Sequence, residues 1–207
     1  QSDSGQSLVD MMELDLIVGS GGVLSHAPRR EQSAKMLIDS FLPEGITSLA
    51  VDSIFMMPQL GVMANIENKE IAEQARVAAL EVFEKDCLIR LGTCIAPVGK
   101  LSGSEIPLRV NLEFKNGEKK DIEVRYGELI RIEAEYEEIK AVLTPAKGVD
   151  VGAGDGEQIS TTIFGGQVGL VFDGRGRPLE IDASSSKRIS NLKKWSEAMN
   201  EYPEIGK

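Results

Sequence analysis

At 207 residues, of which 42% are hydrophobic, the chain is long enough for one or two globular domains with a buried core, and disorder is not expected. Its net charge of -10 argues against a nucleic acid as partner, because binding to phosphates needs a clustered cationic surface and the 23 Lys and Arg residues are scattered. No apolar run is long enough to span a bilayer, and the first residues lack the basic-then-apolar layout of a signal peptide, so we expect a cytoplasmic protein with no membrane partner.

The first half of the chain alternates between strand-like and helix-like patterns. Leu14–Val18 is a short apolar run that is broken by Gly19–Gly22, and Arg30–Phe41 follows with apolar residues at helical spacing. Ser48–Ser53 is typical of a buried strand, and Glu67–Glu84 of a long helix. The alternation predicts a mainly parallel sheet covered by helices.

From about Leu88 onward the apolar pattern changes to a period of two. Apolar residues alternate over Leu108–Phe114 and over Ile122–Tyr126, and the intervening Asn116-Gly117 predicts a tight hairpin turn. Further strands are expected at Ile130–Ala134, Ile139–Leu143, Ile159–Phe164, Val168–Phe172 and Leu179–Ile181. A sandwich or a partly open barrel would bury these strands.

The end of the chain predicts a terminal helix over Lys187–Asn200. An apolar stripe would dock this helix on the rest of the protein, and its members are Ile189, Leu192, Trp195 and Met199. The two patterns together predict an α+β protein. We expect residues 1–98 to form an α/β part and residues 99–207 to form an antiparallel β-module that carries the helix. The small polar residues at Gln1–Ser7 also suggest that the natural chain extends further upstream.

The glycine turn, which we define as Gly19–Gly22, is the strongest candidate for a binding site. A buried strand that ends in glycines lets a ligand approach the backbone without meeting Cβ atoms, and the helix start that follows offers unpaired N–H groups. These features suit the ribose and phosphates of a nucleotide, and the candidate contacts are Gly19, Ser20, Gly21, Gly22 and Ser25. The glycine spacing does not fit the dinucleotide-binding fingerprint, and a plain strand-to-helix turn would use the same residues.

Three other segments offer alternatives. Arg175 and Arg177 lie on a predicted tight turn, where their guanidinium groups would bind a phosphate or a partner carboxylate, or would simply be exposed and aid solubility. Asp150–Gly156 looks like a phosphate loop, but it lies between two strands with no helix behind it, so we expect a glycine-rich turn. Ile54–Pro58 would face a partner or, as Met beside Phe more often does, fill the core.

No metal site and no catalytic residue are assigned from the sequence. The chain has one histidine, His26, and two cysteines, Cys87 and Cys94, whose spacing does not match a zinc motif. We expect both cysteines to be buried, reduced thiols.

Two segments resemble a large superfamily of nucleotide-binding proteins. Ile17–His26 is similar to the adenosine motif of the superfamily that includes actin, the sugar kinases and the heat-shock ATPases, in which a strand ends in a Gly-Gly turn against adenosine. Pro58–Ala64 is similar to the segment that begins the next helix in that superfamily. This resemblance implies that residues 1–98 form the C-terminal half of an actin-like nucleotide-binding domain.

A closer resemblance covers nearly the whole chain. Five blocks in order resemble the accessory-protein family of glutamate mutase (methylaspartate mutase), and they are Gly19–Arg30, Leu49–Gly61, Asp86–Gly99, Val149–Gly154 and Val168–Leu179. Members of this family are regarded as ATP-dependent reactivating chaperones of coenzyme-B12-dependent aminomutases. The resemblance therefore implies subunits of such an aminomutase as partners, ATP with Mg²⁺ as cofactor, and cobalamin only through the partner mutase.

The same resemblance implies that the chain is the C-terminal part of such a protein. The family's aspartate-containing phosphate motifs should lie upstream of Leu14, so ATP hydrolysis by this chain alone is not expected. Two rival functions stay open. A small-molecule kinase of the superfamily would need a catalytic aspartate near the glycine turn, and a plain protein-interaction module would bind no nucleotide there.

Overall fold

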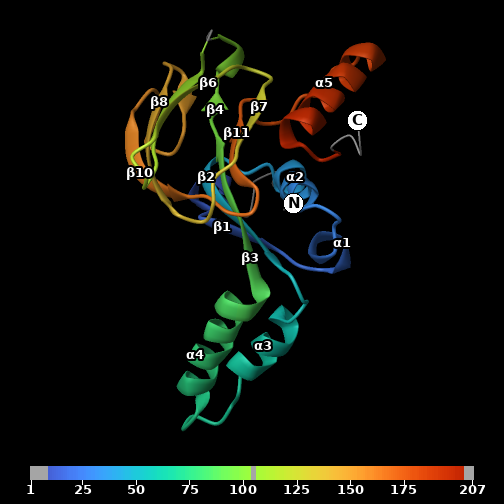
Figure 1. Cartoon of the computed structure of the whole chain (residues 1–207), viewed down its shortest axis with the longest axis vertical. Coiled ribbons are helices and arrows are strands. Elements are labelled where there is room, and N and C mark those ends of the chain that lie inside the picture. The colour runs from blue at the N-terminus through green and yellow to red at the C-terminus, as the bar shows by residue number, and fades with distance from the viewer. Residues whose placement is uncertain (1–8, 104–105, 203–207) are drawn as a thin grey trace.

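A five-stranded sheet forms the centre of the computed structural model, which describes residues 9–103 and 106–202 (Figure 1). Its strands, in spatial order, are β1 (Leu16–Gly19), β2 (Gly45–Asp52), β3 (Leu88–Ala96), β11 (Gly169–Asp173) and β7 (Leu129–Ile132). β1 pairs with β2 and β3 with β11 in parallel, whereas the β2–β3 and β11–β7 pairs are antiparallel. The sheet is therefore mixed, and the prediction of a mainly parallel sheet was wrong. Two helices connect β2 to β3 and return the chain to the same end of the sheet, so β3 runs back against β2.

A second sheet of four antiparallel strands packs against the first. Its strands, in spatial order, are β10 (Ile159–Phe164), β8 (Glu138–Pro145), β5 (Leu108–Glu113) and β6 (Lys119–Val124). β5 and β6 form the predicted hairpin, with Gly117 at φ 86° in the turn. Ile95, Leu170 and Phe172 from the first sheet share one buried cluster with the apolar face of the second, which makes this part of the protein a sandwich. A short pair, β4 (Val98–Gly99) and β9 (Val149–Asp150), lies beside it.

The two sheets do not divide at residue 98. β7 and β11 come from the segment that we expected to form a separate β-module, yet they join the sheet of the first part. β11 is buried along its whole length, because Val171 packs towards the helices while Leu170 and Phe172 pack towards the second sheet. The predicted strand at Leu179–Ile181 was also wrong, since these residues are irregular.

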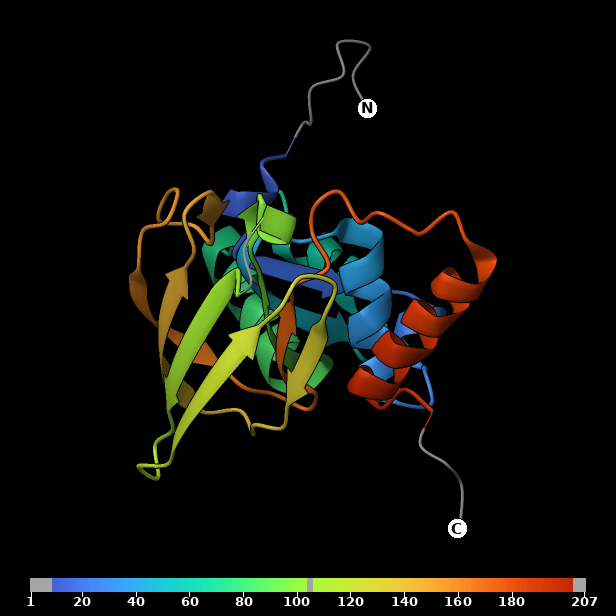
Figure 2. The same ribbon diagram turned by 90° about the horizontal axis from the view of Figure 1, so that it is seen from above.

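Two helices cover the other face of the first sheet, and Figure 2 shows them on the side opposite the second sheet. α2 (Arg30–Phe41) has the predicted bounds and buries Ala34, Leu37 and Ile38. α5 (Ser185–Met199) lies beside it and buries Trp195 and Met199, whereas the other two members of the predicted stripe, Ile189 and Leu192, are exposed. None of the helices in residues 9–103 and 106–202 combines the length and the apolar content needed to cross a membrane.

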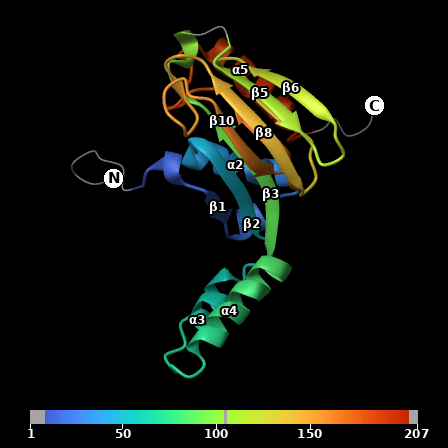
Figure 3. The same cartoon turned by 90° about the vertical axis from the view of Figure 1, so that its left-hand side faces the viewer.

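A pair of helices projects from the rest of the molecule (Figures 1 and 3). α3 (Met57–Ala64) and α4 (Ala72–Val82) form this helical hairpin, and a π-helical turn at Phe83–Cys87 leads into β3. α4 begins later than the Glu67 that we expected, because the side chain of Asn68 accepts a hydrogen bond from the N–H of Glu70 (3.0 Å) and holds a local turn there.

Candidate functional site

The glycine turn lies at the carboxyl ends of two neighbouring parallel strands, where sheets of mixed α/β proteins commonly bind ligands. Gly19 ends β1 and pairs with Val51 of β2. Gly21 has φ 103° and precedes α1 (Gly22–Ser25), a helix of a single turn. Because side chains strain a backbone at such a φ, this position requires glycine.

The glycines of the turn differ in what surrounds them. A Cβ atom at Gly21 or Gly22 would meet nothing within 4 Å, so the backbone of both residues faces open space that a ligand can enter. A Cβ at Gly19 would lie 2.8 Å from Cδ1 of Leu24 and 2.9 Å from a Cδ atom of Leu37. Gly19 therefore allows α1 and α2 to pack closely on β1, and its own surface is not open to a ligand.

Asp52, at the end of β2, ties the glycine turn to the helical hairpin. Its fully buried carboxylate accepts hydrogen bonds from the N–H groups of Met56 (3.1 Å) and Met57 (2.9 Å) at the start of α3, and from the hydroxyl of Ser20 (3.2 Å). Burial alone would raise the pKa of the Asp52 carboxyl, but these three donors hold it below its ordinary value.

The two serines predicted as nucleotide contacts direct their hydroxyl groups inward. The Ser20 hydroxyl donates to the Asp52 carboxylate, and the buried Ser25 hydroxyl donates to the backbone carbonyl of Asp52. Both side chains hold the turn against β2. Of the predicted contacts, Gly21 and Gly22 are the ones whose surroundings leave room for a ligand.

Sequence reasoning missed Asp52, and Ile54–Pro58, which we expected to face a partner or to fill the core, is largely exposed. Phe55, between β2 and α3, has φ 59°, a left-handed conformation that is a genuine outlier for a bulky residue. The sequence did contain a signal for Asp52, because an aspartate stands shortly before a helix whose first turn contains Pro58. Such an arrangement favours a carboxylate that caps the helix N-terminus.

Arg175 and Arg177 form an internal ion-pair cluster, so neither alternative that we considered for them was right. The Asp173 carboxylate accepts two hydrogen bonds from Arg175, through Nε and Nη2 (2.8 Å each), and one from Nη2 of Arg177 (2.9 Å). Arg175 Nη2 also lies 2.8 Å from Asp39 Oδ1 of α2, and Arg177 Nε donates to the carbonyl of Pro43. Both side chains are almost fully buried, so they connect β11 to the end of α2 and are not free for a phosphate or a partner.

Asp150–Gly156 forms a glycine-rich turn, as predicted. Asp150 Oδ1 accepts hydrogen bonds from the N–H groups of Gly152 (2.7 Å) and Gly154 (2.9 Å). Burial alone would raise the pKa of Asp150, but these N–H donors hold it below its ordinary value. The N–H groups that would otherwise face a phosphate thus bind the chain's own carboxylate.

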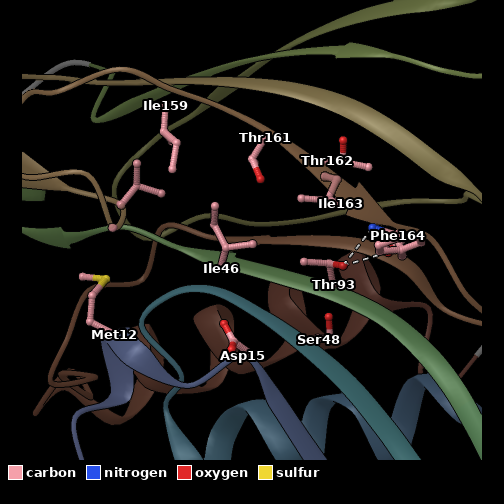
Figure 4. A pocket seen from close by; sticks show the side chains of 12 residues that line it. Met12, Asp15, Ile46, Ser48, Thr93, Ile159, Thr161, Thr162, Ile163 and Phe164 are labelled. Atoms are coloured by element: carbon pink, nitrogen blue, oxygen red, sulfur yellow. Dashed lines mark hydrogen bonds between the residues drawn. The ribbon is translucent and has the colours of Figure 1, made fainter.

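A cavity of about 330 Å³ lies between the first sheet and β10, near the start of β1. Figure 4 shows Asp15, Ser48 and Thr161 among its lining residues, together with Met12 and several isoleucines. The Thr93 hydroxyl is already used, since it donates to the Phe164 carbonyl (2.8 Å) and accepts from its N–H (3.3 Å). Asp15 precedes β1 and Gly19 ends it, so this cavity and the glycine turn lie at opposite ends of the strand.

Within the part of the chain that the structure describes, no group of three or more His, Cys, Asp or Glu residues comes together as a metal site. Cys87 and Cys94 are buried and form no disulfide. Burial raises the pKa of both thiols, and neighbouring carboxylates raise it further.

Comparison with known proteins gives one match. No curated protein and no solved structure matches the chain. The family model described as MutL protein matches residues 3–81, a range that holds the glycine turn, Asp52, α3 and nearly all of α4. MutL in this sense is the family of glutamate mutase accessory proteins. Over residues 3–81 the chain is therefore similar to that family, and the match supports an accessory role for glutamate mutase.

Proposed function

We propose that the chain is part of a reactivating chaperone for a coenzyme-B12-dependent aminomutase such as glutamate mutase, and that the whole protein binds adenine nucleotide at the glycine turn. One observation carries the proposal. The segment that matches the accessory-protein family includes the turn at which Gly21 and Gly22 expose their backbone to open space.

The residues of the turn suit the adenosine end of the nucleotide better than the phosphate end. The two arginines that follow the turn are engaged, since Arg29 pairs with Glu31 (2.9 Å) and Arg30 donates to the carbonyl of Ser25 (3.0 Å). The Asp52 carboxylate is engaged as well, so it is not available to Mg²⁺. We therefore assign adenosine to Gly21 and Gly22, and assign the phosphates and Mg²⁺ to residues outside the turn.

Asp52 offers a route by which nucleotide binding would reach a partner. Its carboxylate bonds to Ser20 in the turn and to the first N–H groups of α3, so a shift in the turn changes how the helical hairpin is held. If the hairpin has two arrangements and the nucleotide binds one of them more tightly, nucleotide binding shifts the protein towards that arrangement. The affinity for the mutase then changes by no more than the ratio of the nucleotide's affinities for the two arrangements.

The test compares two glycines that are equally free of neighbours. Gly22 begins α1 and Gly61 lies within α3, and a Cβ at either position would meet nothing within 4 Å. Valine at Gly22 should weaken ADP binding to the full-length protein by about tenfold or more, because its side chain fills the space that adenosine would occupy. Valine at Gly61 should leave ADP affinity unchanged. Affinity is measured by calorimetry, and reactivation by the recovery of mutase turnover.

Equal ADP affinity for wild type and Gly22→Val would show that adenosine does not bind at the turn. Gly21 is less suitable for this test, because its φ of 103° would strain any side chain and mix a loss of stability with a loss of binding.

The two rival functions are affected differently by the structure. A kinase would need a free catalytic aspartate beside the turn, and Asp52, which lies there, is buried with its carboxylate bonded to three donors. The exposed apolar surface of the helical hairpin favours a protein-interaction module as the second candidate. That reading predicts that the mutase binds equally well with and without nucleotide.

A further inference from the structure

The helical hairpin carries an unusual concentration of exposed apolar side chains. Ten of the 21 large hydrophobic residues that are exposed in the described chain lie between Ile54 and Val82. The cluster of buried residues that holds the hairpin is small and consists of Leu60, Ala79 and Cys87, with the partly buried Met56, Ala64 and Phe83 packed against it. A pair of helices that projects from the body with so much apolar surface outside needs another surface to cover it.

Several of the exposed apolar side chains lie on faces of the helices other than the face that packs inside the hairpin. On α4, Ala75 and Ala79 are four residues apart and form the buried face. Val77 and Leu80 are three residues apart on a different face, and Leu80 is 55% exposed. On α3, Val62 is 76% exposed. We call the exposed apolar residues of α3 and α4 the hairpin surface, and we use Val62 on α3 and Leu80 on α4 to test it.

The base of the hairpin adds an aromatic side chain to this surface. Phe55 is half exposed although it is large and apolar, and its backbone is held at φ 59°. Met57 at the start of α3 is exposed as well. The family-matched segment thus presents apolar groups from the base of the hairpin along both of its helices.

Charge around the hairpin surface indicates what kind of partner fits. Between Glu67 and Asp86 there are six acidic and three basic side chains, and one of these bases, Arg76, pairs with Glu73 (2.6 Å). Two copies of this chain would bring together surfaces of the same sign, and each copy has a net charge of -10. A second copy is therefore disfavoured, and a surface with Lys and Arg residues at its edge is favoured.

We propose that the hairpin surface docks on the aminomutase, at a patch of that protein that is apolar in its centre and basic at its edge. The proposal rests on the function proposed above and names the surface that binds the mutase. Because Asp52 bonds to the start of α3 and to the glycine turn, the base of the hairpin is connected directly to the candidate nucleotide site.

The experiment measures binding of purified glutamate mutase to full-length accessory protein by calorimetry at two ionic strengths. The test variant carries Val62→Asp and Leu80→Asp. The matched control carries Ile189→Asp and Leu192→Asp on α5, which are exposed apolar residues of another helix. The test variant should bind at least about tenfold more weakly than wild type, because it places two carboxylates in the apolar contact, and the control should bind like wild type.

A second variant tests the charge. Glu81→Lys with Glu84→Lys changes exposed residues of α4 and of the turn that follows it, and it should also weaken binding. Higher ionic strength should weaken wild-type binding more than it weakens binding of this variant. Thermal unfolding of every variant is measured as well. If the variant with Val62→Asp and Leu80→Asp does not fold, the charge variant alone is compared with wild type.

Each outcome bears on the proposal. Wild-type affinity in both hairpin variants would overturn the docking surface and leave the accessory function standing. A wild-type protein that does not bind the mutase would overturn the proposed function and this inference with it. A wild-type dimer in light scattering that becomes a monomer in the test variant would show that a second copy covers the surface, and would also overturn the inference.

Discussion

Asp52 is the residue on which two parts of the molecule depend. Its carboxylate satisfies two N–H groups at the start of α3 and holds the Ser20 hydroxyl of the glycine turn. Since its pKa in the folded protein is below the ordinary value of 3.8, ionised Asp52 stabilises the fold. This stabilisation is fully present above pH 3.8 and is lost as the pH falls through the lower pKa of the folded state.

We expect Asp52→Asn to lower the free energy of unfolding by about 1–3 kcal/mol at pH 7, because an amide cannot accept all three bonds. Urea titrations at pH 7 and well below pH 3.8 measure this, and the difference between wild type and variant should shrink at the lower pH, where Asp52 becomes protonated. If the loss of unfolding free energy is the same at both pH values, the charge of Asp52 does not contribute to stability.

Arg175 is the second residue whose role only the structure reveals. Removing this guanidinium should be strongly destabilising, because the buried Asp173 carboxylate would lose both bonds from the Arg175 side chain and keep the one from Arg177. Arg175→Met should lower the free energy of unfolding by about 3–5 kcal/mol. Arg109→Ala is the control, since Arg109 forms an exposed pair with Glu123 (3.7 Å) and should cost less than about 1 kcal/mol. Equal losses in the two variants, measured by urea unfolding, would contradict this.

At the scale of elements, local patterns predicted what local interactions determine. α2 was predicted with its bounds because its apolar residues recur at helical spacing, and the β5–β6 hairpin because Asn116-Gly117 favours a tight turn. The start of α4 was wrong because the Asn68 side chain competes for the backbone. The predicted strand at Leu179–Ile181 failed because alternation of apolar residues does not guarantee a partner strand.

α5 docks through only half of its predicted stripe. Trp195 donates from its indole N–H to the carbonyl of Gly127 (2.9 Å), and its ring centroid lies 5.0 Å from Cζ of Arg175. Trp195→Ala should therefore lower the free energy of unfolding by about 3–5 kcal/mol, whereas Leu192→Ala, at a residue that is 44% exposed, should cost about 0.5 kcal/mol or less.

Trp195 is the chain's only tryptophan, so fluorescence reports directly on the docking of α5. In wild type and in Leu192→Ala, the red shift of emission on urea addition should follow the same transition as far-UV circular dichroism. A red-shifted spectrum of the native protein would show that α5 is not docked.

At the scale of the whole molecule, the sequence could not assign strands to sheets. β7 alternates like the strands of the second sheet, whereas β11 contains a continuous apolar run, Leu170–Phe172, and only their pairing shows that both belong to the first sheet. The sequence also could not predict the buried ion-pair cluster of Asp173, because Asp39 and Pro43 are distant in sequence from Arg175 and Arg177, which they contact. In the candidate site, the sequence identified the glycine turn but not which glycine is open, because that depends on Leu24 and Leu37 beside Gly19.

The molecule combines a well-buried sandwich with a sparsely packed helical hairpin, and this contrast has a measurable consequence. Local opening costs less free energy where fewer apolar side chains are buried, so amide hydrogens there exchange faster. α2 and α4 allow a matched comparison, because they have 12 and 11 residues. α2 buries four side chains, Ser33, Ala34, Leu37 and Ile38, whereas α4 buries two small ones, Ala75 and Ala79.

We expect the amides of α4 in the free protein to exchange at least about tenfold faster than those of α2, as measured by hydrogen–deuterium exchange with mass spectrometry. Strands β5 and β8, whose inward side chains lie in the sandwich core, should exchange more slowly than α4. Protection of α4 equal to that of α2 in a monomeric sample would mean that Leu60, Ala79 and Cys87 hold the hairpin more firmly than their small number indicates. Slow exchange of α4 that appears only after glutamate mutase is added would instead show that the partner supplies the missing cover.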